Sequence, residues 1–406
     1  MGYSASRAAD TIPKRVTHDG VAISVAPAKV LALDEYVKHW LKNKNALTLS
    51  AELIHSTLPS DSDAFASDYG YPLFTVGMRW NINNVTMHRS GYWWEAREVD
   101  YDSRLGNIAT LYGTFTRPLL RSRRWEVDYL LGTGLAWGKH KYSPGNNIDN
   151  ELTGSRWLIY FVAGLQASYR VTTDWLVRGG LEFYHHSNGA INRPNKGANY
   201  IGPTLGVVYA PYDATRACRT RLHEPFRRYN YLELTWGTGA KTLNEDWQKT
   251  QFHTPYGDPQ YRTGRFHVYP TLALRTAFMR RYARRWASGV GVDVFYGSYA
   301  DDVARMDEAD GYEEKHSRWS LGISAKHSAF YHNLAVSTVL GWYLYRHMGH
   351  NAKEVEKPYY EQVGLSYSFR ALQGLTVGFS IKTHLTKADY TELLLSMPFR
   401  LGRKEK

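Results

Sequence analysis

The chain has 406 residues, a net charge of +12 at pH 7 and a single cysteine, Cys218, which excludes an intrachain disulfide. It contains no run of about 18 apolar residues, so helical membrane spans are excluded. Tyrosine and glycine are abundant, as is common in antiparallel β proteins. The positive charge indicates anionic surroundings, and because no nucleic-acid-binding motif accompanies it, lipid phosphates fit better than nucleic acid.

The first 44 residues do not show the pattern of β-strands. Within residues 27–45, the spacing of Val30, Val37 and Trp40 predicts a short amphipathic helix, so we expect residues 1–44 to form a non-barrel segment. Residues 1–7 lack the basic and apolar regions of a secretory signal. Because a protein of the bacterial outer membrane needs such a signal, we expect this sequence to represent a processed form.

From Asn45 onward the chain is a succession of alternating segments of about ten residues, the length with which a tilted strand crosses a bilayer. The third segment is the least regular, since Glu95 and Glu98 lie near its middle. The segments make 16 predicted strands, an even number, as in single-chain bacterial barrels. They lie near 46–56, 71–82, 92–102, 106–117, 125–138, 155–171, 174–187, 199–211, 229–241, 267–279, 286–300, 317–330, 334–346, 360–371, 374–384 and 390–402.

The connections between these segments alternate between short turns and long polar loops. Transmembrane barrels have short periplasmic turns and longer outer loops, whereas both ends of a β-sandwich carry similar turns. The sequence therefore predicts an all-β, antiparallel transmembrane β-barrel in the outer membrane. The short turns are 121–124, 171–174, 280–285 and 371–374, and the long loops are 139–156, 188–198, 244–265, 300–317 and 347–358.

One connection breaks this scheme. Residues 212–228 lie on the predicted periplasmic side, yet they form a long, arginine-rich linker between blocks 45–211 and 229–406. One barrel of 16 strands and two tandem barrels of eight both pair every strand edge. We expect a single barrel, because single-chain barrels usually close once.

A candidate site lies at the end of the strand predicted at 174–187, in the segment Leu-Glu-Phe-Tyr-His-His-Ser-Asn-Gly at 181–189. His185 and Ser187 are two residues apart, so their side chains share one face, as a general base and the hydroxyl that it would activate. That face also carries Leu181 and Phe183, which indicates contact with lipid. On the next strand, the alternation places Asn199 on the same side.

Two other histidines resemble this site in sequence but are predicted to face inward. His186 shares the lumen side with Glu182, and His384 shares it with Lys382. We therefore expect structural roles for both histidines. No ligand spacing for a metal and no phosphate-binding glycine loop is apparent, so no cofactor is implied.

The 181–189 segment, the loop Asn-Arg-Pro-Asn-Lys-Gly at 192–197 and Asn-Tyr-Ile-Gly-Pro at 199–203 resemble the PagL-type lipid A 3-O-deacylases. They are most similar to the longer acyloxyacyl-hydrolase-like members found in Bacteroidetes. The resemblance covers roughly 45–211, while the second block resembles only the C-terminal extension of those longer members.

The resemblance implies an outer-membrane enzyme that hydrolyses an ester-linked acyl chain of lipid A in lipopolysaccharide, surrounded by outer-membrane lipids. It implies Ser187 as the nucleophile and His185 as the general base. Asn188 matches a position that is implied to help hold the oxyanion, with Gly189 beside it in the oxyanion and substrate region.

The sequence departs from the family at the third catalytic position, where Asn199 stands in place of a glutamate. An Asn carbonyl can accept a hydrogen bond from imidazole, but it cannot stabilise the imidazolium as a carboxylate does. Three hypotheses follow: a lipid A esterase with a Ser-His-Asn site, a catalytically degenerate barrel that is a structural or accessory subunit associated with other outer-membrane proteins, and a passive pore.

Overall fold

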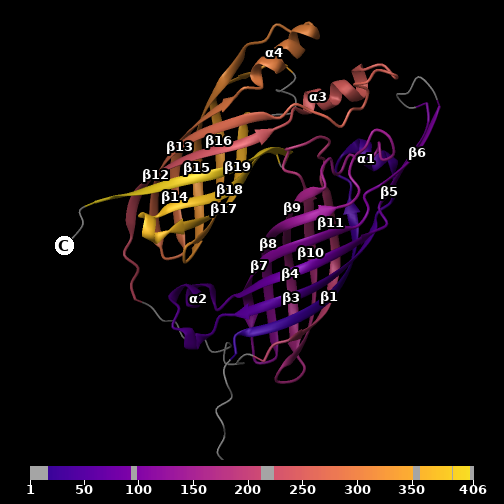
Figure 1. Cartoon of the computed structure of the whole chain (residues 1–406). Coiled ribbons are helices and arrows are strands. Elements are labelled where there is room, and N and C mark those ends of the chain that lie inside the picture. Colours follow the sequence, from indigo (N-terminus) through magenta and orange to yellow (C-terminus); the bar gives the residue numbers. More distant parts are fainter. Residues whose placement is uncertain (1–16, 93–97, 212–223, 351–356, 386, 403–406) are drawn as a thin grey trace, which may run out of the picture.

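The computed structural model describes residues 17–92, 98–211, 224–350, 357–385 and 387–402. Within these residues the strands form two closed antiparallel barrels of eight strands each, and one small three-stranded sheet (Figure 1). The prediction of an antiparallel barrel is thus confirmed, whereas the single 16-strand barrel is wrong and the alternative of two barrels is right. Among the described residues, no helix is both long and apolar enough to cross a membrane.

The first barrel closes because β1 pairs on one side with β11 and on the other side with β3. The order of the strands around it is β1-β11-β10-β9-β8-β7-β4-β3. Their bounds are β1 (Asp19–Leu31), β3 (Asn45–Ser56), β4 (Leu73–Asn83), β7 (Ile108–Arg121), β8 (Trp125–Gly138), β9 (Trp157–Arg170), β10 (Trp175–Ser187) and β11 (Ala198–Tyr209).

Two sequence predictions for this block differ from the structure. Residues 1–44 were expected to lie outside the barrel, but β1 is one of its strands; Val21, Ile23 and Val25 are exposed, and Ala22 and Ala26 face inward. The alternation in β1 is easy to miss because its inward side chains are small and weakly polar. A short helix, α1 (Glu35–Trp40), follows β1.

The predicted strand near 92–102 is not part of the barrel wall. The region instead contributes β6 (Val99–Arg104), which pairs with β5 (Thr86–Gly91), and β5 pairs with β2 (Leu41–Asn43) in the small sheet. Glu95 lies outside the described residues. The predicted total of 16 barrel strands is nevertheless correct, because the prediction includes one strand that is not in the wall, near 92–102, and omits one that is, β1.

The second barrel consists of β12 to β19 in sequence order and closes by the pairing of β12 with β19. All eight strands lie where the alternation predicts them. They are β12 (Tyr229–Lys241), β13 (Tyr269–Ala283), β14 (Trp286–Gly297), β15 (His316–Tyr331), β16 (Leu334–Met348), β17 (Tyr359–Phe369), β18 (Leu375–His384) and β19 (Lys387–Leu401).

Short helices occur in the connections at both ends of the barrels. At the short-turn end, the β3–β4 connection carries η1 (Pro59–Asp61) and α2 (Ala64–Tyr69), and the β17–β18 turn contains η4 (Arg370–Leu372). At the opposite end, the loops of the second barrel contain α3 (Asn244–Gln248), a π-helical turn η3 (Lys249–His253) and α4 (Ala300–Ala309). Most of the basic linker 212–228 lies outside the described residues.

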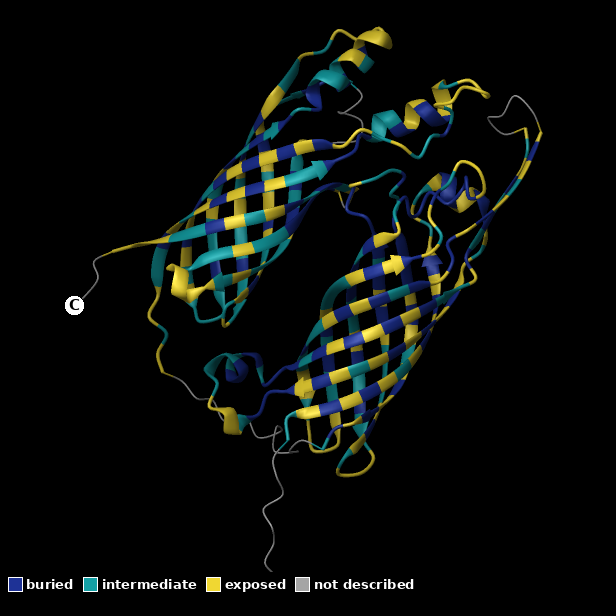
Figure 2. Ribbon diagram, in the orientation of Figure 1, coloured by how far each residue is buried: buried dark blue, intermediate teal, exposed yellow. Residues whose placement is uncertain are grey.

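Exposed and buried residues alternate along the walls of both barrels (Figure 2). The outward side chains are mainly large and apolar, such as Leu53 and Met78 in the first barrel and Leu274 and Val290 in the second. Polar side chains fill the lumen of the first barrel, where Arg79 binds Glu182 at 2.7 Å and Arg178 binds Glu52 at 2.5 Å. Pairing of this kind is what allows charged groups to be buried.

The two barrels contact each other at both ends. At the short-turn end, Asp63 of the first block accepts hydrogen bonds from His332 at 2.9 Å and from Tyr331 at 3.1 Å. In addition, the hydroxyl of Tyr69 donates to the carbonyl of Phe330 at 3.0 Å. We call these contacts the short-turn clasp; the contacts at the long-loop end involve the candidate site.

Candidate functional site

The candidate site lies at the outer end of β10, where this strand pairs with β11 on one side and β9 on the other. In this register His185 lies opposite Asn199 of β11, and Ser187 lies opposite Ile159 of β9. On the approach to the site, Leu181 is 52% exposed and Phe183 40% exposed. The side chains of β10 that lead to His185 and Ser187 therefore lie on the outer wall of the barrel.

The imidazole of His185 is oriented by Asn199. Its Nδ1 lies 2.8 Å from Oδ1 of Asn199. Because Oδ1 can only accept, Nδ1 carries the proton of the neutral imidazole, and Nε2 is left with the lone pair of a base. The register and the hydrogen bond together bring these two residues into contact, as their shared face predicts.

Ser187 is 4% exposed and lies on the same strand face, two residues beyond His185. Within the described residues, no hydrogen bond joins its hydroxyl to His185. In enzymes without bound substrate, catalytic hydrogen bonds are often long and shorten only in the complex. The backbone thus places Ser187 and His185 on the same strand face, two residues apart.

The loop between β10 and β11 folds back over the imidazole. Gly197 has φ +75°, and a Cβ added there would lie 2.4 Å from Cε1 of His185. The N–H of Gly197 donates to the carbonyl of Leu152 at 3.0 Å, which ties this loop to the β8–β9 loop. Only glycine allows the backbone to approach the ring this closely.

A half-buried cation fixes the same loop. The ammonium group of Lys196 lies 2.7 Å from Asp34 and 3.0 Å from Glu151. Although burial alone would lower the pKa of Lys196, the two carboxylates raise it above its ordinary value, so the side chain stays charged. Burial also raises the pKa of Glu151. These ion pairs stabilise the β10–β11 loop, which covers the ring of His185 at Gly197.

Asn188, which was expected to help hold an oxyanion, is engaged within its own loop and with the β8–β9 loop. Its backbone N–H donates to the side chain of Asn195 at 2.9 Å. Its side-chain amide donates to the carbonyl of Asn192 at 3.0 Å and to Ser155 at 3.2 Å. Gly189 follows with φ +61° and accepts a hydrogen bond from Thr391 of the second barrel at 3.1 Å.

The other two histidines lie inside the barrels, away from Ser187. His186 is fully buried and lies 3.1 Å from the hydroxyl of Thr110. His384 is buried in the second barrel, 3.1 Å from the hydroxyl of Tyr343. In the part of the chain that the structure describes, no group of three or more His, Cys, Asp and Glu side chains could hold a metal ion.

The sequence predicts no role for Asn195, Gly197 or Thr391, although the first two lie in the loop 192–197 that resembles the family. Gly197 gives a weak signal, since a glycine just before a strand often marks a close approach of the backbone. Asn195 is one of several polar loop residues and gives no signal of its own. Thr391 lies about 200 residues from the motif, and nothing in the local sequence connects it to Gly189.

Comparison with known proteins identifies two matching family models. The lipid A 3-O-deacylase (PagL) model matches residues 69–208, and the model of the acyloxyacyl hydrolase C-terminal domain matches residues 230–402. The two matches correspond closely to the two barrels. None of the curated proteins matches the chain.

Several solved structures resemble the chain distantly. The crystal structure of the outer membrane enzyme PagL is 11% identical, with a TM-score of 0.28, and the similarity covers 46% of this chain and 97% of that one. The COG4313 outer membrane channel from Pseudomonas putida F1 is 6% identical, with a TM-score of 0.20, covering 95% of this chain and 96% of that one. Similarities of this size carry no argument about function.

Proposed function

The chain belongs to the family of PagL-type lipid A 3-O-deacylases with an acyloxyacyl hydrolase C-terminal domain, and on this premise we propose that it is an outer-membrane serine esterase that removes an ester-linked acyl chain from lipid A of lipopolysaccharide. The observation that carries the proposal is the hydrogen bond between His185 and Asn199, on the same outer wall as Ser187. It leaves Nε2 of His185 as the basic nitrogen of a ring that shares its strand face with Ser187.

In the proposed mechanism, the hydroxyl oxygen of Ser187 attacks the ester carbonyl while Nε2 of His185 takes the hydroxyl proton. The tetrahedral intermediate collapses, the bond to the sugar oxygen breaks, and His185 returns the proton to that oxygen. Water, deprotonated by His185, then releases the fatty acid from the acyl-enzyme and restores Ser187. Asn199 keeps the imidazole in the required tautomer throughout.

The outer-membrane location is supported by the exposed apolar side chains around both barrels. An apolar surface of this extent would be unstable in water. Tryptophans lie near both ends of the first barrel wall, as expected for interfacial side chains. They include Trp80, Trp137 and Trp157 at one end and Trp125 and Trp175 at the other.

The direct test is a mass spectrum of lipid A from cells that express the chain. We expect the loss of one hydroxyacyl chain relative to cells without it. An unchanged spectrum from cells in which the protein is folded in the outer membrane would overturn the proposal and favour an accessory subunit without catalytic activity.

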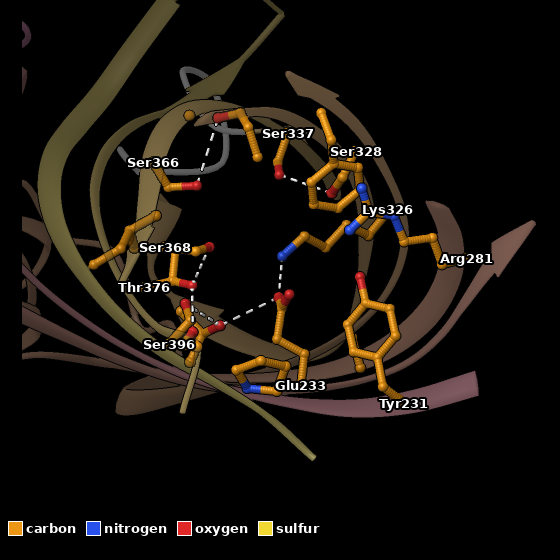
Figure 3. A pocket seen from close by; sticks show the side chains of 18 of the residues that line it. Tyr231, Glu233, Arg281, Lys326, Ser328, Ser337, Ser366, Ser368, Thr376 and Ser396 are labelled. Atoms are coloured by element: carbon orange, nitrogen blue, oxygen red, sulfur yellow. Dashed lines mark hydrogen bonds and ion pairs between the residues drawn. The ribbon is translucent and has the colours of Figure 1, made fainter. Parts of the chain in front are cut away.

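The second barrel contains a cavity of about 930 Å³ near its short-turn end (Figure 3). Figure 3 shows hydroxyl side chains around its wall, and an ion pair between Lys326 and Glu233. Farther along the lumen, Lys382 and Lys241 both bind Asp389, at 2.6 and 2.5 Å, beside the buried ring of Tyr360. These side chains occupy the lumen near the long-loop end of the second barrel.

A passive pore is therefore not expected. In the first barrel the ion pairs Arg79–Glu182 and Arg178–Glu52 lie in the lumen around a pocket of about 10 Å³, and in the second barrel Lys241 and Lys382 bind Asp389 in the lumen near the long-loop end. In planar lipid bilayers we expect the purified chain to give no stable conductance steps above the lipid baseline. Reproducible single-channel steps would contradict this prediction and support the pore.

Gly197→Ala is expected to lower the rate of acyl release by about 10²-fold, the order of loss that a 1 Å misplacement of a catalytic group causes. The added methyl group would displace the ring of His185, and φ +75° is unfavourable for alanine. Gly145→Ala is the matched control, since a Cβ at this position meets no atom within 4 Å. Both rates are measured on purified lipopolysaccharide, with circular dichroism to confirm folding. Wild-type activity of Gly197→Ala would show that the close approach is unimportant for catalysis.

A further inference from the structure

The second barrel contacts the turn that directly follows Ser187. The hydroxyl of Thr391 donates to the carbonyl oxygen of Gly189 at 3.1 Å. The carbonyl oxygen of Ala190 accepts two hydrogen bonds from Thr242, one from its N–H at 3.1 Å and one from its hydroxyl at 2.9 Å. Thus two consecutive carbonyl groups of the turn are held by side chains and backbone of the other barrel.

The two threonines are themselves placed by regular structure. Thr242 directly follows β12, and Thr391 lies on β19 opposite Ala240 of β12. They therefore occupy neighbouring strands at the same end of the second barrel. A third contact joins the same elements, because the guanidinium group of Arg193 donates to the carbonyl of Thr242 at 3.0 and 3.2 Å.

The turn has an unusual backbone that needs such support. Gly189 has φ +61° and Ala190 has φ +65°, and the left-handed region is unfavourable for alanine. Ala190 is fully buried, so its peptide groups cannot rely on water. The hydrogen bonds from the second barrel compensate for the free-energy cost of this backbone conformation. They also determine the direction of the peptide planes that carry the carbonyl groups of Gly189 and Ala190.

The direction of these planes has a chemical consequence. In a trans peptide the C=O and N–H groups point in opposite directions. Because the carbonyl of Gly189 points to Thr391, the N–H of Ala190 points away from the second barrel. In the described part of the chain, the N–H groups of Gly189 and Ala190 have no hydrogen-bond partner, whereas that of Ile191 donates to Asn188. A buried N–H without a partner is rare in proteins.

We propose that Thr391 and Thr242 are positioning residues for deacylation: they hold the Gly189–Ala190 turn so that the N–H of Ala190 can donate to the oxyanion formed at the ester carbonyl. This inference rests on the proposed function. The inference gives the second barrel a part in the reaction. It also identifies the N–H of Ala190 as a donor to the oxyanion, which is needed because the N–H and the side-chain amide of Asn188 are both engaged in other hydrogen bonds.

The test compares Thr391→Val with Thr391→Ser in the full chain, with released hydroxy fatty acid measured from purified lipopolysaccharide. Valine keeps the shape of threonine but cannot donate, and loss of one oxyanion donor costs about 10²–10³-fold in kcat. We expect Thr391→Val to lower kcat at least about 10-fold with KM within about 2-fold, because the N–H of Ala190 would be displaced but not removed. Thr391→Ser keeps a hydroxyl at this position and should keep kcat within about 3-fold of wild type.

Tyr69→Phe is the matched control, because it removes a hydroxyl from the short-turn clasp and leaves the turn untouched. The inference is overturned if Thr391→Val retains wild-type kcat, if Thr391→Ser is as slow as Thr391→Val, or if Tyr69→Phe causes an equal loss. Hydrogen–deuterium exchange over residues 186–195 should be faster in Thr391→Val than in Tyr69→Phe.

The outcomes separate this inference from the proposed function. If wild type releases acyl chains and Ser187→Ala does not, normal kinetics of Thr391→Val reject the positioning role alone. If wild type releases none, the proposed function fails and the catalytic role of the turn fails with it, whatever the exchange rates show about its rigidity.

Discussion

Ser187→Ala is expected to lower the rate of lipid A deacylation by about 10³-fold or more. Removal of the nucleophile from a serine hydrolase leaves only the catalysis that binding and oxyanion stabilisation provide, and measured losses reach about 10⁶-fold. The effect is expected in kcat rather than KM, because the hydroxyl of Ser187 forms its bond in the reaction and contributes little to binding. The measurement is the rate of release of hydroxy fatty acid from lipopolysaccharide.

Three further variants make this experiment decisive. Ser366→Ala removes a hydroxyl from the cavity of the second barrel and should leave the rate unchanged. His185→Ala should cost a similar amount to Ser187→Ala, and the double variant should be no slower than either, because residues that act as a unit are not additive. Equal activity of wild type and Ser187→Ala would eliminate the Ser-His mechanism.

Asn199→Asp is expected to raise kcat, by about 10- to 10³-fold. In the transition state the imidazole of His185 becomes positively charged, and a carboxylate at the position of Oδ1, 2.8 Å from Nδ1, would stabilise that charge. In a serine protease, the opposite exchange of aspartate for asparagine costs about 10⁴-fold. The gain expected here is smaller because Asn199 already presents its oxygen to His185, so the correct tautomer does not need to be regained.

Asn199→Leu is the control for the same position. It removes the acceptor and should lower kcat, since Nδ1 would lose the partner that fixes the tautomer. If Asn199→Asp and Asn199→Leu both have wild-type rates, Asn199 has no part in the reaction. The rates should be compared at matched folded fractions, because Asn199 is buried and an aspartate there loses solvation.

The alternation of side chains predicts most barrel strands because it reflects a local property, the contrast between lipid and lumen. It fails at β1, where Ala22, Ser24 and Ala26 face inward and give little contrast. It also cannot predict closure. Whether β11 pairs with β1 or with β12 depends on backbone hydrogen bonds at strand edges, and these do not alter which side chains are apolar.

The candidate site, like the fold, is predicted from the sequence only where strand alternation determines it. The common face of His185 and Ser187 follows from their spacing, and the contact with Asn199 follows once β10 and β11 pair in register. The approach of Gly197 to the ring and the hydrogen bond from Thr391 depend on how loops and barrels pack in three dimensions. The sequence carries no periodic signal for such contacts, so they required the structure.

The placement of Ser187 and His185 on the outer wall of the first barrel determines how substrate reaches them in the proposed reaction. A lipid would arrive by lateral diffusion within its leaflet, without crossing the lumen or leaving the membrane. The relevant concentration is then the mole fraction of lipid A in the surface, and not the amount per volume of solution. Neutral lipids would slow the enzyme by diluting that surface, even when the total quantity of lipid A stays constant.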